Sequence, residues 1–268
     1  MSKKKVLIVT QEMQPYTALT EVAEIARKLP QHIQESGMEI RILMPRYGTI
    51  NERRHRLHEV VRLSGMNIIV DDDDYPLIIK VASLPEARMQ VYFLDNEDFF
   101  KRKFLFEDEN QQAFEDNADR AVFFCKGVLE TVKKFGWPPN IIRCHGWLTS
   151  LIPLYLKTAY KTEPLFQQAK VVYSAYQPSH EQHLGADFLQ KANINNLTPE
   201  DLKPYEAGLH QGAISFADGA IKGSEVLDPE VQKALDAMQA PVLDYPGEEY
   251  LGAYMNFYSS LLEEEEAV

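Results

Sequence analysis

Histidine, glycine and tryptophan stand together where one predicted strand ends, and this group is the first candidate for chemistry. His145 follows the predicted strand 140–144 and precedes Gly146 and Trp147. Glycine allows a ligand to approach the backbone closely, and an indole ring offers an apolar wall. His145 could therefore act as an acid, a base or a hydrogen-bond donor, with a hydrogen-bonded structural histidine as the alternative.

A second group of polar residues, His180, Glu181 and His183, could supply metal ligands. The two histidines lie one helical turn apart if the segment is helical. However, H-E-x-H is not the H-E-x-x-H pattern of zinc hydrolases, and no third ligand is evident. The acidic run 71–74 lacks the alternating ligands and the glycine of a calcium loop, and is typical of a solvated hairpin tip. We expect no metal at either place.

Familiar catalytic and nucleotide-binding motifs are missing from the sequence. It contains no G-x-G-x-x-G loop, no Walker loop and no G-x-S-x-G elbow. An aromatic stripe near the end of the chain has two interpretations, packing against a sheet or an exposed face that binds a sugar or a partner. The stripe consists of Tyr250, Leu251, Tyr254, Phe257, Tyr258 and Leu261.

The elements that position these residues alternate between strands and helices. The β-branched run 5–10 predicts a first strand that is buried on both faces of a parallel sheet. Thr20 can cap a helix that ends at Gly37, and the segment 39–44 predicts the next strand. Further strands are predicted at 140–144, 170–174 and 219–222, and helices at 114–135, 148–156 and 229–238, with helical pieces between 181 and 216.

This order predicts one α/β domain over residues 1–268, with a doubly wound, mostly parallel Rossmann-like sheet. Short β-like runs separated by turn residues make 57–95 a small antiparallel insertion. A terminal strand and helix are expected over 241–262. Ligands bind outside the carboxyl ends of the strands in such a sheet, and His145 stands at one of these ends.

The composition excludes several classes of protein. A formal net charge of −12 repels phosphate backbones and anionic bilayers, so we expect neither nucleic-acid nor membrane binding. No apolar run approaches the roughly 18 residues of a membrane span, and the apolar run near the start is too short for a signal peptide. Cys125 and Cys144 form no C-x-x-C pair, which fits a reducing compartment. We therefore expect a cytoplasmic protein.

Several ordered motifs resemble the amino-terminal, acceptor-side domain of bacterial glycogen and plant starch synthases, which are two-domain glycosyltransferases of the GT-B architecture. Residues 11–15 resemble the family's S-E-M-x-P, and residues 41–47 resemble R-V-L-L-P-x-Y. The segment 114–120 is similar to a D-N-x-x-R-F helix, and 136–147 to G-W-x-P-D-I-I-H-x-H-D-W. The similarity runs from residue 5 to about 176, and more weakly to about 235.

The resemblance implies one half of a GT-B fold. It also implies retaining transfer of glucose from a nucleotide sugar, usually ADP-glucose, to the non-reducing end of an α-1,4-glucan, with neither a metal nor an organic cofactor. His145 coincides with the family's active-site histidine, and Glu24 stands where the family has a helix aspartate. Trp147, Tyr176 and Gln177 are the remaining candidates for substrate binding, the last two from a stretch similar to H-N-L-A-Y-Q-G.

The sequence also departs from the family pattern. Gly146 replaces the aspartate beside the histidine, and residues 18–21 replace K-T-G-G. This removes the lysine that contacts the sugar nucleotide and the glycines that admit it. The 268 residues have room for only one of the two domains, and one Rossmann-like domain cannot close a cleft on itself.

Three hypotheses follow. We expect a glycogen synthase-like protein of α-glucan metabolism with little or no transferase activity as an isolated chain, for which a partner glycosyltransferase chain could supply the missing half. The alternative is a non-catalytic module that binds an α-glucan or regulates a partner enzyme through aromatic residues such as Trp147, Tyr176 and Tyr254. The third is a metal-dependent hydrolase that uses His180 and His183 with Glu181.

Overall fold

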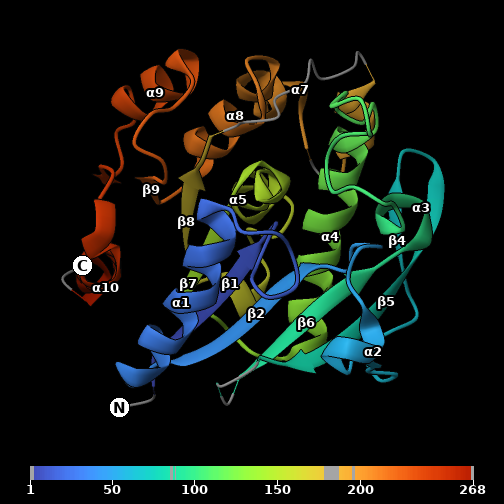
Figure 1. Ribbon diagram of the computed structural model, residues 1–268. Helices are drawn as coiled ribbons and strands as arrows, with labels where there is room; N and C mark the ends of the chain where they lie inside the picture. Colours follow the sequence, from blue (N-terminus) through green and yellow to red (C-terminus); the bar gives the residue numbers. More distant parts are fainter. Residues whose placement is uncertain (1–2, 85–86, 88, 178–186, 195–196, 267–268) are drawn as a thin grey trace.

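The computed structural model describes residues 3–84, 87, 89–177, 187–194 and 197–266, and Figure 1 shows their arrangement. The strands are β1 (Lys5–Thr10), β2 (Glu39–Pro45), β3 (His58–Glu59), β4 (Met66–Val70), β5 (Asp73–Ser83), β6 (Gln90–Asp95), β7 (Ile141–His145), β8 (Lys170–Ala175), β9 (Gly219–Lys222) and β10 (Val242–Leu243). The α-helices are α1 (Glu21–Glu35), α2 (Glu52–His55), α3 (Glu97–Phe100), α4 (Asn117–Phe135), α5 (Leu151–Lys157), α6 (Phe188–Ala192), α7 (Pro199–Leu202), α8 (Leu209–Phe216), α9 (Pro229–Asp236) and α10 (Tyr250–Glu266).

The described strands form one sheet with β1 near its centre. Its order is β10-β9-β8-β7-β1-β2-β6-β5-β3, and β4 pairs with β5. The six pairs between β10 and β6 are parallel, and the pairs of β5 are antiparallel. The chain winds outward from β1 in both directions, through β2 and β6 on one side and β7 to β10 on the other. The predicted doubly wound α/β fold is confirmed.

Local sequence signals account for the main helix ends. The Thr20 hydroxyl accepts a hydrogen bond from the backbone N–H of Ala23 at 3.1 Å and so caps α1, as its position predicts. Gly136 has a left-handed φ of 59° and ends α4. Helix α4 begins at Asn117, three residues later than the periodicity predicts, and Asp116 precedes it.

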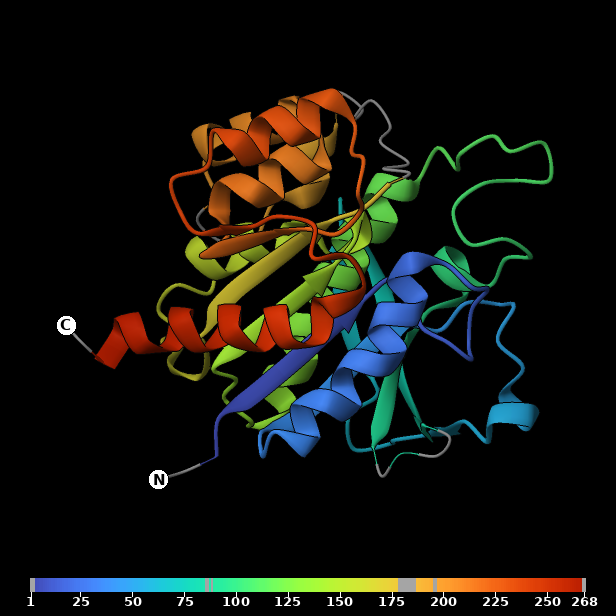
Figure 2. The same cartoon turned by 60° about the vertical axis from the view of Figure 1, so that its left-hand side comes forward.

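Helices cover both faces of the sheet. Figure 2 shows α1 and α10 side by side on one face, and these two helices contact each other. Helices α4, α5 and α8 pack together on the opposite face. Both faces of the central strand are therefore covered, and Val6, Leu7, Ile8 and Val9 are all fully buried. This explains the continuous apolar run that predicts β1.

The antiparallel insertion is smaller than the sequence predicts. β4 and β3 pair antiparallel with β5, as expected for residues 57–95. However, β6 (Gln90–Asp95), which the sequence places inside the insertion, lies parallel to β2 and extends the central sheet. β6 alternates polar and apolar residues only at its start, and its buried end fits a covered parallel strand.

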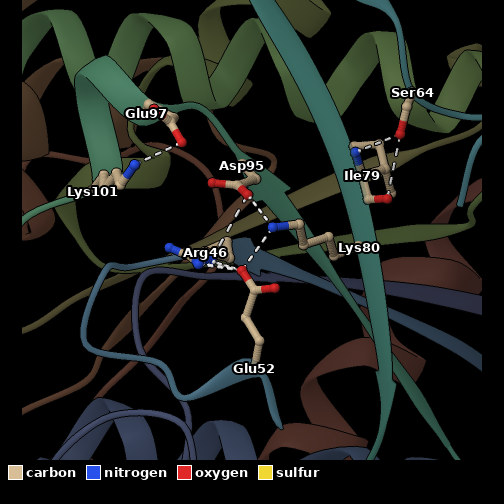
Figure 3. A network of polar contacts seen from close by, with 8 residues as sticks. All are labelled: Arg46, Glu52, Ser64, Ile79, Lys80, Asp95, Glu97 and Lys101. Atoms are coloured by element: carbon tan, nitrogen blue, oxygen red, sulfur yellow. Dashed lines mark hydrogen bonds and ion pairs between the residues drawn. The ribbon is translucent and has the colours of Figure 1, made fainter. Parts of the chain in front are cut away.

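Four charged side chains form ion pairs that connect the insertion to the parallel part of the sheet (Figure 3). The Lys80 ammonium on β5 lies 2.7 Å from a carboxylate oxygen of Glu52 and 2.7 Å from one of Asp95. Arg46, directly after β2, donates from Nε to the same Glu52 oxygen at 2.7 Å. Burial acts to raise the pKa of Glu52, but the hydrogen bonds from Lys80 and Arg46 outweigh it and lower this pKa.

Candidate functional site

The predicted site lies where the winding direction of the sheet reverses. The carboxyl ends of β1 and β7 are neighbours, with Thr10 opposite His145, and β8 places Ser174 on the other side of His145. The loops that follow these strands contribute Gln11 and Tyr176. Ligands of open α/β sheets bind at such a switch point, so the fold brings this group to the expected place.

His145 is buried and bound to Tyr176. Its side chain is 0% exposed, and its Nδ1 lies 2.8 Å from the Tyr176 hydroxyl. The two rings stack with their centroids 6.0 Å apart. Burial, assisted by the charge of Arg143, holds the pKa of His145 well below its ordinary value. The imidazole is therefore neutral, and its Nε2 has no hydrogen-bond partner among the described residues.

Gln11 occupies the space beside Gly146. Gly146 has a φ of 85°, which favours glycine, and a β-carbon there would overlap the side-chain amide of Gln11. The Gln11 Oε1 accepts a hydrogen bond from the Leu148 N–H at 3.3 Å, and its Nε2 donates to Glu12 at 3.2 Å. An amide from β1's loop thus stands where the family pattern has an aspartate side chain.

Two carboxylates surround this group. Glu12 accepts a hydrogen bond from the Thr20 hydroxyl at 3.3 Å, and burial raises the pKa of Glu12 although Gln11 and Thr20 oppose the rise. Glu21, in the first turn of α1, accepts a hydrogen bond from the Ser224 hydroxyl at 2.5 Å. Ser224 in turn accepts one from the backbone N–H of Gln177 at 3.2 Å. The loops after β1, β8 and β9 are therefore tied together.

The other predicted residues differ in their surroundings. Trp147 is 1% exposed and packs edge-on against Phe106, with ring centroids 5.1 Å apart. Tyr176 is 3% exposed and lies against Gly223, where a β-carbon would overlap its ring. Glu24 instead pairs with Lys28 at 2.5 Å on the exposed surface of α1, so the structure does not bring its carboxylate to the His145 group.

The residues proposed as metal ligands, His180, Glu181 and His183, lie outside the described residues. Within the described ranges, no group of three or more histidine, cysteine, aspartate or glutamate side chains could hold a metal ion. In the same ranges, no helix is long and apolar enough to cross a membrane. A surface cavity of about 660 Å³ lies between α8 and α9, and its lining includes none of the predicted site residues.

Sequence reasoning missed four residues that the structure places around this site: Gln11, Glu12, Glu21 and Ser224. Gln11 had a signal, because it departs from the family's serine in the same sequence in which Gly146 departs from the aspartate. Glu21 replaces a family glycine, which also marks it. No sequence pattern marks Ser224 as a site residue. Its position becomes evident only from the hydrogen bond that its hydroxyl donates to Glu21.

Comparison with known proteins decides the family. The model of the starch synthase catalytic domain matches residues 5–239. The chain belongs to this family. The glycogen synthase of Chlorobium limicola is 40% identical over 207 residues, which cover 76% of this chain and 41% of that protein. The glycogen synthase of Chlorobaculum tepidum is 37% identical over 244 residues, covering 87% of this chain and 49% of that protein. The resemblance inferred from the ordered motifs is confirmed.

A solved structure shows the same fold. The catalytic domain of starch synthase IV from Arabidopsis thaliana, bound to ADP and acarbose, matches with a TM-score of 0.70 at 20% identity. The match covers 97% of this chain and 50% of that chain. This starch-synthase-type chain therefore has the architecture of one part of a GT-B enzyme. It spans about half the length of the curated relatives and of this structure.

Proposed function

We propose that this chain acts in α-glucan metabolism as a starch-synthase-type domain with little or no glucosyl transfer of its own. The family reaction is transfer of glucose from a nucleotide sugar such as ADP-glucose to an α-1,4-glucan. The observation that carries the proposal is the complete burial of His145 beneath Tyr176. A sugar can reach the imidazole only if the side chains that bury it, Tyr176 among them, move away.

The charges around the site support the same proposal. A nucleotide diphosphate brings negative charge, which transferases stabilise with fixed cations and backbone donors. In this chain the first turn of α1 carries the carboxylate of Glu21 where the family pattern has a glycine. Thr20 and Glu21 also add side chains where the family pattern has glycines that admit the donor.

A second component is also part of the proposal. The chain spans about half of its glycogen synthase relatives, and we propose that a partner glycosyltransferase chain supplies the remainder when transfer occurs. In that case His145 would hydrogen-bond the transferred glucose. Tyr176 would have to rotate away from Nδ1, and Glu24 would have to leave Lys28 in order to line the cleft.

The alternative function, glucan binding through Trp147, Tyr176 and Tyr254, receives less support from the geometry. These three side chains are 1%, 3% and 0% exposed, and a flat aromatic face must be accessible to stack on a sugar ring. Glycogen co-sedimentation separates the alternative from the leading proposal. We expect the chain to stay in the supernatant, and pelleting that Trp147→Ala abolishes would support the alternative.

A donor-binding measurement tests whether the burial of His145 prevents a nucleotide sugar from binding. We expect calorimetric titration of the purified chain with ADP or ADP-glucose to give no saturable heat. The matched variant is Tyr176→Ala, which uncovers His145, and His58→Ala at an exposed histidine serves as the control. Saturable ADP binding by the wild-type chain that is lost in His145→Ala would contradict the proposed closure.

A further inference from the structure

A charged side chain is buried between the sheet and the C-terminal helix. Arg143, in the middle of β7, is 0% exposed. It lies two residues before His145 and so points to the same face of the sheet. Its guanidinium carbon lies 4.9 Å from the centre of the Tyr254 ring on α10. Because arginine stays protonated in proteins, a full positive charge lies inside this interface.

No group in the described residues balances that charge. Nε, Nη1 and Nη2 of Arg143 all lack a hydrogen-bond partner there. The contrast is Arg120, also fully buried, whose Nε donates to the Phe99 carbonyl at 2.8 Å and whose Nη1 donates to Asn117 at 2.7 Å. An uncompensated buried ion costs several kcal/mol, so Arg143 needs a counter-charge or several acceptors.

The polar groups around Arg143 are the hydroxyls of tyrosine and serine side chains, each of which can donate one hydrogen bond. The hydroxyls of Tyr254 and Tyr258 on α10 face Arg143 and influence its ionisation. Ser174 on β8 pairs in register with His145 and offers a further buried hydroxyl on this face. Guanidinium, phenol and hydroxyl N–H and O–H groups that converge in a buried place suit an anion.

We propose that Arg143, Tyr254 and Tyr258 bind a small inorganic anion, such as chloride, between β7 and α10. The anion neutralises the guanidinium and accepts hydrogen bonds from the two phenols. A monatomic anion is chosen because Arg143, Tyr254 and Tyr258 are all 0% exposed, which restricts the space between them. The anion would fasten α10, which lies beyond the matched residues 5–239, to the strand that carries His145.

Thermal unfolding in two salts tests this site. The melting temperature of the wild-type chain is measured in sodium chloride and in sodium gluconate at equal ionic strength. We expect chloride to raise it by about 2–4 °C, because a ligand that binds only the folded state stabilises it. Arg143→Met should abolish the difference. Arg41→Met is the control, since Arg41 also stacks on aromatic rings, 4.3 Å from the Phe135 centroid, but is only half-buried.

A gentler variant and a direct measurement cover the case in which Arg143→Met does not fold. Tyr258→Phe keeps the guanidinium and should weaken the chloride effect. A crystal soaked in sodium bromide should show an anomalous peak next to the Arg143 guanidinium. Equal melting temperatures of the wild type in both salts, a chloride effect that persists in Arg143→Met, or no bromide peak at this place would each overturn the proposal.

Discussion

The side-chain amide of Gln11 fills the space beside Gly146, the residue that follows His145. Gly146 adopts a φ of 85°, and the Gln11 amide lies where its β-carbon would be. This packing requires both a glycine at position 146 and a side chain as long as glutamine at position 11. A smaller residue at position 11 would leave space beside the glycine, and a larger residue at position 146 would displace the amide.

This contact predicts an energetic coupling. Gly146→Ala should destabilise the chain by about 2–4 kcal/mol, because alanine is strained at this φ and overlaps Gln11. In the double variant with Gln11→Ala the overlap disappears and only the strain remains. Urea unfolding should therefore give a double-variant loss about 1 kcal/mol smaller than the sum of the single losses. Strict additivity would show that the two side chains do not meet.

The burial of His145 predicts a dependence of stability on pH. Because its pKa is depressed in the folded chain, protons bind preferentially to the unfolded chain below about pH 6.5, and stability falls as the pH drops. His145→Asn should reduce this fall between pH 7 and 5 by about 2 kcal/mol. His58→Asn, at an exposed histidine, should leave the fall unchanged. An equal fall in the wild type and His145→Asn would mean that His145 binds its proton as readily in the folded chain as in the unfolded chain.

At the scale of elements, the sheet joins a parallel core to a short antiparallel insertion through paired charges. Lys80 lies between Glu52 and Asp95, and Arg46 binds Glu52 from the end of β2 (Figure 3). The same figure shows an exposed pair, Glu97 with Lys101, one helical turn apart. The two groups allow a matched comparison of a partly buried network with a solvated pair.

Removing the charge of Glu52 should destabilise the chain only at pH values at which that carboxylate is ionised. The pKa of Glu52 is lowered by Lys80 and Arg46 against the effect of burial, so its contribution is present above about pH 4.5 and is lost as the pH falls through the lower folded value. Glu52→Gln should cost about 0.5–1 kcal/mol at pH 7, a small figure because the network is partly solvated.

The measurement is the difference in the free energy of unfolding between wild type and Glu52→Gln from pH 7 to 3. This difference should shrink toward zero at the acid end. Glu97→Gln is the control and should show no measurable loss at any of these pH values. A loss in Glu52→Gln that stays constant with pH would mean that shape or packing, and not charge, accounts for it.

The elements show which features could be predicted from sequence. The helix cap at Thr20 and the helix end at Gly136 depend on neighbouring residues, so they could be predicted. The place of His145 at a strand end follows from the apolar run before it. The parallel pairing of β6 with β2 depends on residues far apart in the chain. The short β-like runs and turn residues around β6 predicted an insertion strand instead. The bond between Glu21 and Ser224 could not be predicted for the same reason.

At the scale of the whole molecule, the doubly wound sheet presents its switch point with the loops after β1, β8 and β9 tied to each other. The family match and the motif order agree on a starch-synthase-type domain, and the chain spans about half of its glycogen synthase relatives. The burial of His145 beneath Tyr176 leads to one expectation: the chain by itself transfers little or no glucose.

Transfer of radiolabelled glucose from ADP-glucose to glycogen tests this central claim most directly. A two-domain glycogen synthase serves as the positive control, and UDP-glucose is assayed in parallel. We predict that the purified chain incorporates no label above the protein-free background with either donor. Incorporation that rises with the amount of chain and disappears in His145→Ala would contradict the account.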